Sequence, residues 1–291
     1  MNDGMRIQPA WDRPLPAPAK INLFLHVVGR RPDGYHLLQT AFRMVSRWDS
    51  LTFSPRHDGA LRLAKPLPGV PEESDLCFKA ARLLREATGC PLGVTISLDK
   101  CLPMGGGLGG GSSDAATVLL ALNALWGLGL SRSRLMALGL SLGADVPFFI
   151  FGRSAFAEGV GEELQAISLP DAWYLVLEPP VSVPTAAIFS ARDLTRDSEI
   201  IKIAAFPADG LASFGKNDLE PVACKLYPQV AEVLAWLRQF GAARMSGSGA
   251  CVFAEYGSEA EALAVLKQVP ENWKAWVACS LDEHPLLGSA G

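Results

Sequence analysis

The sequence lacks any apolar run of 18 residues or more, so it predicts no membrane-spanning helix. The sequence also lacks a large excess of charge of either sign. The 26 basic and 30 acidic residues leave a net charge of −4, without the basic excess typical of nucleic-acid-binding proteins. Residues 1–16 lack the charged start and apolar stretch of a signal peptide, and we expect them to form an N-terminal extension. These absences predict a protein that binds neither membrane nor nucleic acid.

Paired cysteines are missing as well. The six cysteines are dispersed along the chain and form no Cys-x-x-Cys motif, which argues against a zinc site or a disulfide framework. Reduced thiols of this kind are typical of a cytoplasmic protein. With 291 residues, 49% of them hydrophobic, the chain is long enough to bury one large core or two smaller ones.

Glycine, by contrast, is concentrated in one stretch. Residues 103–113 read Pro-Met-Gly-Gly-Gly-Leu-Gly-Gly-Gly-Ser-Ser, and a helix-forming run follows. Glycine lets backbone N–H groups approach a ligand closely, and the start of a helix adds free N–H donors and a positive dipole end. The stretch therefore predicts a phosphate-binding loop, the alternative being a flexible linker. It lacks the lysine of a P-loop, and its match to the dinucleotide fingerprint is weak because no second strand follows.

The remaining pattern predicts an α+β protein with two lobes that meet at a cleft, residues 17–165 and 166–291. Strands are expected over 19–28, 39–45, 49–54, 93–98, 147–151, 154–158, 173–178, 242–245, 250–256 and 273–280. Helices are expected over 74–88 (with Ser74 as N-cap and Gly89 as the end), 113–126, 131–142, 185–192, 218–226, 230–240 and 258–267. The order of elements after residue 165 is that of a split β-α-β unit.

Two polar residues and one carboxylate interrupt apolar surroundings. Lys20 and Asn22 lie two apart on a predicted strand, so their side chains share one face. On its own, Lys20 could equally be a solvated surface charge. Asp145 precedes an apolar run, where it could cap a helix, form a structural ion pair, or serve as a catalytic carboxylate that the charge of Lys20 keeps ionised.

Two further segments carry chemistry. In the loop 31–36, adjacent Tyr35 and His36 offer a stacking face and a titratable group, although such pairs often only pack. A second glycine turn, Ser246-Gly-Ser-Gly249, could be a plain hairpin or a set of backbone donors that closes on the same phosphates.

Taken in order, the segments 18–23, 31–36, 103–113, 143–148 and 246–249 resemble the motifs of the GHMP kinases, which include galactokinase, homoserine kinase, mevalonate kinase and phosphomevalonate kinase. The resemblance runs from about residue 18 to residue 280. It implies an N-terminal ATP-binding lobe like domain 2 of ribosomal protein S5, and a ferredoxin-like C-terminal lobe that contributes to the substrate side. The Tyr-His loop resembles the branch of the family that acts on a cytidine diphosphate substrate.

The resemblance also implies a reaction. The phosphoryl group of ATP would pass to the 2-hydroxyl of the methylerythritol part of that substrate, in the non-mevalonate route to isoprenoid precursors. Asp145 matches the catalytic base and Lys20 the lysine beside it. Mg²⁺ would be carried mainly by the nucleotide phosphates and water, with no protein ligand assigned. The protein would be a monomer or a weak homodimer.

The remaining site residues are carried over motif by motif. The residues that match the ATP-binding positions are Pro103, Met104, Gly105, Gly106, Gly107, Leu108, Gly109, Gly110, Gly111, Ser112, Ser113, Ser246, Gly247, Ser248 and Gly249. Those that match the substrate side are Asn22, Tyr35, His36, Thr185 and Phe189. Two alternatives remain: another GHMP kinase that phosphorylates homoserine or mevalonate, and an inactive relative that serves as a nucleotide-binding module.

Overall fold

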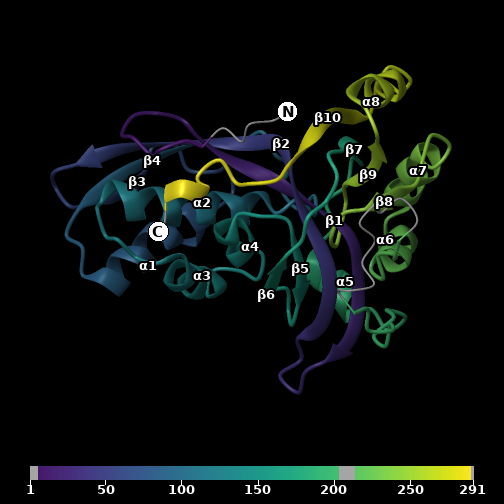
Figure 1. Cartoon of the computed structure of the whole chain (residues 1–291), viewed down its shortest axis with the longest axis horizontal. Helices are drawn as coiled ribbons and strands as arrows, with labels where there is room; N and C mark the ends of the chain where they lie inside the picture. Colours follow the sequence, from purple (N-terminus) through teal and green to yellow (C-terminus); the bar gives the residue numbers. More distant parts are fainter. Residues whose placement is uncertain (1–5, 203–213, 290–291) are drawn as a thin grey trace.

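The computed structural model of the chain describes residues 6–202 and 214–289. One sheet with the strand order β3-β4-β2-β10-β7-β9-β8 runs through both lobes (Figure 1). Off this path, β1 and β5 pair with β2, and β6 pairs with β5. The strands are β1 (Leu15–Arg30), β2 (His36–Arg56), β3 (Leu61–Leu63), β4 (Gly93–Asp99), β5 (Ala155–Glu158), β6 (Glu163–Ala166), β7 (Trp173–Glu178), β8 (Ala243–Met245), β9 (Val252–Tyr256) and β10 (Lys274–Leu281). The helices are α1 (Leu76–Thr88), α2 (Gly110–Leu125), α3 (Arg132–Leu140), α4 (Val146–Phe151), α5 (Thr185–Ser190), α6 (Glu220–Leu226), α7 (Pro228–Leu237) and α8 (Glu259–Leu266). The expected α+β class is confirmed.

Strands β1 and β2 form a long antiparallel hairpin that extends beyond the body of the molecule in Figure 1. β1 is buried from Leu15 to Val27, because β2 pairs along one edge and helix α2 packs against it. Its register with β2 shifts at three points, one of them between Asn22 and Phe24. Such bulges bend a strand and change which way its side chains point. The sequence predicted β2 as two strands, and it is one.

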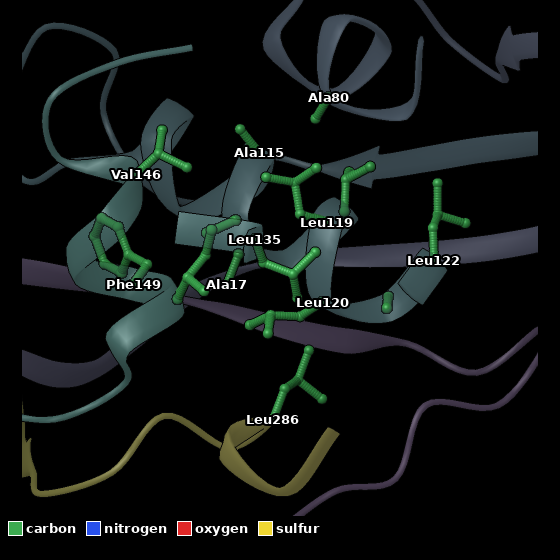
Figure 2. Close-up of a cluster of buried hydrophobic side chains, with 14 of the residues drawn as sticks. Ala17, Ala80, Ala115, Leu119, Leu120, Leu122, Leu135, Val146, Phe149 and Leu286 are labelled. Atoms are coloured by element: carbon green, nitrogen blue, oxygen red, sulfur yellow. The ribbon is translucent and has the colours of Figure 1, made fainter. Parts of the chain in front are cut away.

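The core of the first lobe lies between this sheet and helices α1 to α4 (Figure 2). Helix α2 supplies Ala115, Leu119 and Leu120 to this core, all fully buried. Helix α1 is capped by the Asp75 side chain, which accepts the N–H of Cys77, so the expected cap at Ser74 was wrong by one residue. The expected end at Gly89 is confirmed, and its left-handed backbone closes the helix.

One element was assigned to the wrong class. Residues 147–151, expected to form a strand, lie in helix α4, which has Pro147 in its first turn and ends at Gly152 in the left-handed conformation. The run Pro-Phe-Phe-Ile-Phe is apolar on every side, and a short buried segment of this kind has no periodicity that separates a helix from a strand. The short strands β3 and β6 were not predicted.

The second lobe has the β-α-β-β-α-β order of a ferredoxin-like fold. Its strands lie in the order β10-β7-β9-β8, all antiparallel. Helices α6, α7 and α8 pack around them and enclose a second buried cluster. This arrangement is the split β-α-β unit that the sequence predicted.

The two lobes are joined where β10 pairs with β2 over two residue pairs, Ser280 with Val45 and Leu281 with Met44. A third apolar cluster, from β1 and β2 on one side and β7, β9 and β10 on the other, fills the junction. Beyond β10 the chain returns to the first lobe, where Leu286 is buried in its core. Leu286 therefore packs with the first lobe, although it follows the last strand of the second lobe in the sequence. Among the residues described, no helix is long and apolar enough to cross a membrane.

Candidate active site

The glycine-rich stretch lies between β4 and α2, as expected, but helix α2 begins at Gly110, three residues earlier than predicted. Gly107 lies close to the backbone of Ser246, in the segment that follows β8. Its φ is +74°, and a Cβ atom there would fall 2.0 Å from the carbonyl oxygen of Ser246. At Gly109, φ is +70° and a Cβ atom would meet the ring of Phe149 at 2.9 Å. Only glycine fits the loop at these two positions.

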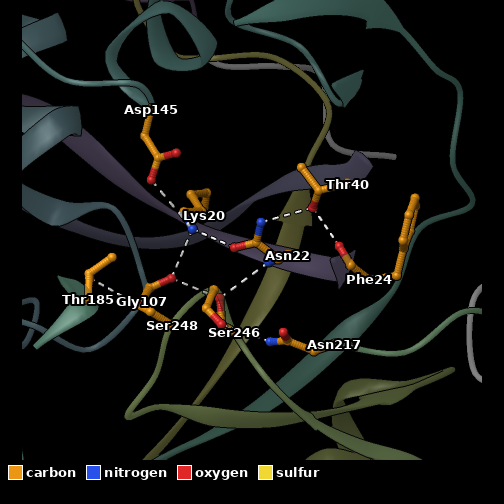
Figure 3. A network of polar contacts seen from close by, with 11 residues as sticks. Lys20, Asn22, Phe24, Thr40, Gly107, Asp145, Thr185, Asn217, Ser246 and Ser248 are labelled. Carbon is orange, nitrogen blue, oxygen red and sulfur yellow. Dashed lines mark hydrogen bonds and ion pairs between the residues drawn. The ribbon is translucent and has the colours of Figure 1, made fainter. Parts of the chain in front are cut away.

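Lys20 and Asn22 point to the same side of β1, as the sequence predicted, and both are buried. Lys20 Nζ donates hydrogen bonds to Asn22 Oδ1 and to the carbonyl oxygen of Gly107, the latter at 3.0 Å (Figure 3). The amide of Asn22 in turn donates to Thr40 Oγ1 at 2.9 Å. Lys20 is therefore part of an ordered polar network and is not a solvated surface charge.

Asp145 lies directly before α4 and points toward Lys20 in Figure 3. Its carboxylate oxygen is 3.6 Å from Lys20 Nζ, and its side chain makes no capping hydrogen bond to the helix. Burial lowers the pKa of Lys20, and the charge of Asp145 opposes that shift. The Asp145 side chain is one-third exposed, so it can receive a ligand that enters the cleft.

The second glycine turn closes on the first. Ser246 Oγ donates to the carbonyl oxygen of Gly107 at 2.9 Å and accepts the backbone N–H of Asn22 at 3.2 Å. Asn217, which the sequence analysis missed, donates through Nδ2 to the carbonyl oxygens of Met245 and Gly247, both at 2.8 Å. The turn links the antiparallel strands β8 and β9 and is held by side chains from two sides.

On the far side of the cleft, Tyr35 lies at the tip of the β1–β2 hairpin and is 65% exposed. His36 begins β2, and its ring packs against Phe189 of α5 with 5.0 Å between ring centroids. Thr185, also on α5, contacts Ser248 through their hydroxyl groups at 2.7 Å. The substrate-side residues of the sequence analysis therefore come from two elements that face each other.

A cavity of about 960 Å³ brings these groups together. The expected site residues that line it are Lys20, Asn22, Tyr35, His36, Pro103, Met104, Gly105, Gly106, Gly107, Leu108, Gly109, Gly110, Gly111, Ser112, Asp145, Thr185, Phe189, Gly247, Ser248 and Gly249. Two expected residues do not line the cavity. Ser246 lies behind the glycine loop, and Ser113 is buried inside α2 with its N–H bound to the carbonyl oxygen of Gly109.

A buried charge cluster supports the start of the loop, and the sequence analysis missed it too. Lys100 forms ion pairs with Asp49 of β2 and Asp114 of α2. Asp49 also accepts the N–H groups of Cys101 and Leu102. Burial raises the pKa of Asp114 to about 7, Asp49 adds to the shift, and Lys100 opposes it. No local pattern marks such a cluster, because its members are far apart in the sequence.

The described residues do not form a metal site. Within residues 6–202 and 214–289, no three His, Cys, Asp or Glu side chains lie close enough together to hold a metal ion. The cavity is instead lined by the backbone of the glycine loop and the start of helix α2, by the Lys20–Asp145 pair, and by the aromatic rings of Tyr35, His36 and Phe189. These groups suit a phosphate-bearing ligand beside a second, ring-bearing one.

Comparison with known proteins agrees with this geometry. The model of the GHMP kinases N terminal domain matches residues 75–153, and that of the GHMP kinases C terminal matches residues 203–275. Two curated relatives, from Aromatoleum aromaticum and Thiobacillus denitrificans, carry the name 4-diphosphocytidyl-2-C-methyl-D-erythritol kinase. The first is 60% identical over 95% of this chain and 96% of its own length, and the second 60% identical over 93% and 96%.

Solved structures give the same family. A crystal structure of 4-(cytidine 5'-diphospho)-2C-methyl-D-erythritol kinase matches with a TM-score of 0.78 and 38% identity, over 92% of this chain and 99% of that one. A homoserine kinase from Cytophaga hutchinsonii has a TM-score of 0.70 at 18% identity over 96% and 97% of the two chains, which supports the fold alone. The chain described here belongs to the GHMP kinase family, as the family models, its relatives and its fold agree.

Proposed function

We propose that this protein transfers the γ-phosphoryl group of ATP to the 2-hydroxyl of 4-diphosphocytidyl-2-C-methyl-D-erythritol, a step in the non-mevalonate route to isoprenoid precursors. The observation that carries the proposal is the Lys20–Asp145 pair, which lies beside the glycine loop in a cavity that the rings of His36 and Phe189 also line. The names of the relatives and of the matched crystal structure support the choice of substrate.

In the proposed mechanism, the glycine loop binds the ATP phosphates. Its N–H groups and the N-terminus of α2 supply fixed positive dipoles where negative charge accumulates during transfer. The turn Ser246–Gly249 covers the phosphates from the other lobe. The loop is held in shape by the hydrogen bonds that Gly107 receives, so these dipoles need no reorganisation during the reaction.

Asp145 acts as the general base in this proposal. Its exposed carboxylate accepts the proton of the substrate hydroxyl as the oxygen attacks phosphorus. Lys20 lies beside this carboxylate and stabilises the negative charge on the attacking oxygen. Because Asn22 and Gly107 accept two of the N–H groups of Lys20, the third remains available to face Asp145 and the substrate.

Mg²⁺ enters, in this proposal, as part of the nucleotide substrate. It neutralises phosphate charge, and it is typically bound through phosphate oxygens, water and one or two hard oxygen ligands. Asp145 and Ser112 carry oxygen atoms of that kind in the cavity. The six free cysteines support the proposal of a cytoplasmic protein. Light scattering on the purified protein would separate the proposed monomer from a weak homodimer.

The test is a substrate panel. Release of ADP is measured in a coupled assay with the cytidylylated methylerythritol, mevalonate and homoserine as acceptors. We expect turnover with the cytidylylated substrate alone. Turnover with mevalonate or homoserine alone would place the protein in another branch of the family, and ATP turnover with none of the three would favour a nucleotide-binding module without catalysis.

A further inference from the structure

His36 is held by a partner that neither the sequence nor the proposed function assigns. Arg196 lies in the segment after α5, and its Nε donates a hydrogen bond to His36 Nε2 at 3.1 Å. The ring of Phe189 also contacts the imidazole of His36 and is tilted by 35° to it. The imidazole is thus fixed both by a ring contact and by a charged donor.

The guanidinium of Arg196 is itself anchored. Its Nη2 donates to the carbonyl oxygens of Phe189 at 3.1 Å and Ala191 at 2.7 Å, and its Nη1 donates to that of Leu194 at 3.0 Å. These carbonyls belong to the end of α5 and the turn after it. The position of Arg196 is therefore set by backbone atoms, so it brings a rigid donor to His36.

The chemistry of this contact fixes the proton on His36. An arginine side chain offers only donors and keeps its proton in proteins, so the nitrogen that faces it must carry a lone pair. In neutral imidazole one nitrogen accepts and the other donates. With Nε2 as acceptor, the proton lies on Nδ1. The imidazolium form would set two N–H groups against each other, and burial together with Arg196 and Arg30 lowers the pKa of His36.

We infer that Arg196 is a positioning residue that holds His36 in the Nδ1–H tautomer, so that the ring meets the pyrimidine end of the substrate as a neutral hydrogen-bond donor. The role toward substrate rests on the proposed function, whereas the tautomer does not. Cytosine carries hydrogen-bond acceptors at O2 and N3, which are suitable partners for such a donor. His36 and Phe189 both line the cavity, and their ring centroids are 5.0 Å apart, so the donor and the aromatic face lie close together there.

The tautomer can be measured in the full-length protein without any ligand. The chain has four histidines, so long-range proton–nitrogen correlation spectra of ¹⁵N-histidine-labelled protein resolve each ring, and His36→Gln assigns the signal of interest. We expect a protonated-type Nδ1 and an unprotonated-type Nε2 for His36. A protonated Nε2 in the wild-type protein would overturn the inference.

Variants test the cause. Arg196→Met removes the donor, and we expect the Nε2–H tautomer of His36 to become populated. Arg196→Lys keeps a group that can only donate, so we expect it to restore the Nδ1–H form at least in part. Arg192→Met, at an exposed arginine of the same segment, is the matched control and should leave the signal unchanged. An unchanged His36 signal in folded Arg196→Met would overturn the assigned role.

Kinetics separate positioning from general stability. For Arg196→Met we expect KM for the cytidylylated substrate to rise about 10-fold or more, as for loss of a hydrogen bond to an aligned group. We expect kcat and KM for ATP to change less than about 3-fold. If kcat and KM for ATP worsened as much as KM for the cytidylylated substrate, the result would contradict the role of Arg196 toward substrate. If the substrate panel identifies a different acceptor while the Nδ1–H tautomer is observed, the proposed function fails and the assignment of Arg196 as the cause of the tautomer stands.

Discussion

Lys20 Nζ lies 3.6 Å from a carboxylate oxygen of Asp145, yet the two side chains differ sharply in exposure, 4% for the lysine and 33% for the aspartate. In the proposed mechanism, the lysine whose charge stays fixed is buried, and the carboxylate that meets the substrate is partly open to the cleft. We expect Asp145→Asn to lower kcat by about 10²-fold to 10⁴-fold, the range for loss of a general base, while the Kd for ATP changes little. Stopped assays and nucleotide titration measure the two quantities. Turnover close to that of the wild type would rule out Asp145 as the base.

Lys20→Met should lower kcat more than it raises either KM, because the charge acts on the attacking oxygen and on Asp145. The variant should still fold, since burial already disfavours the charged lysine and the methionine side chain has a similar length. Lys65→Met, at an exposed position, is the control. A rise in KM with kcat unchanged would reduce Lys20 to a binding residue.

Gly107→Ala tests the close approach of the two glycine turns. The new Cβ would fall 2.0 Å from Ser246 O, so one turn must move, and we expect ATP turnover to fall at least about 10-fold together with a lower Tm. Gly127→Ala is the matched control, because Gly127 has a similar φ of +64° and no atom within 4 Å of the added Cβ. It should cost about 1–2 kcal/mol in strain and leave the kinetics unchanged. Equal kinetics in the two variants would contradict the proposed contact.

Asn217→Ala tests whether the second turn needs its side-chain anchor. The change leaves the carbonyls of Met245 and Gly247 without their donor, and we expect a loss of about 1–3 kcal/mol in the free energy of unfolding and a higher KM for ATP. Asn123 is another buried asparagine, and its side chain exchanges hydrogen bonds with the backbone of Leu130, away from the cavity. Asn123→Ala should show a similar stability loss with KM unchanged, and a raised KM in both would point to a general effect of destabilisation.

Asp114 makes stability depend on pH. Its pKa of about 7 in the folded protein lies above the ordinary value of 3.8, so between these values the folded state holds a proton that the unfolded chain has released. The Asp114 contribution to the free energy of unfolding therefore falls as pH rises from about 4 to about 7, and the loss is complete above about pH 7. Asp114→Asn removes this titration.

Denaturant unfolding at about pH 5 and about pH 8 measures the effect. Relative to the wild type, we expect Asp114→Asn to gain stability at the higher pH. Asp58→Asn is the control, because the Arg56 side chain lowers the pKa of Asp58 to about 2 and this group does not titrate in that window. Parallel pH profiles for the wild type and Asp114→Asn would contradict the raised pKa.

The sequence predicted those parts of the site whose chemistry is local. The glycine run, the spacing of Lys20 and Asn22 on one strand, and the helix after the loop can each be recognised within a few residues. The structure brings Lys20 and Asp145 together, which the sequence offered only as one of several interpretations of Asp145. The two-lobed α+β fold was also predictable, because strand and helix periodicities are distinct in the second lobe.

What the sequence missed depends on distant partners. Asn217 acts on backbone atoms nearly thirty residues away, and Lys100 lies between carboxylates from β2 and α2. Neither shows a pattern at short range. Helix α4 was predicted as a strand because its run of apolar residues has no periodicity that marks a helix. The structure buries most of these side chains, so no polar face was needed. In each case tertiary packing decided the outcome, and local propensity did not.

The carbonyl oxygen of Gly107 receives Lys20 Nζ and Ser246 Oγ, so one peptide unit joins three segments spread over most of the chain. During translation the segments that contain Lys20 and Gly107 leave the ribosome long before the segment that contains Ser246. Until the residues around Ser246 have emerged, the glycine loop lacks its cover and one of the donors that shape it. The site that we propose for the nucleotide is therefore completed late in synthesis, and in this proposal ATP cannot stabilise the nascent first lobe in the way that it stabilises the finished protein.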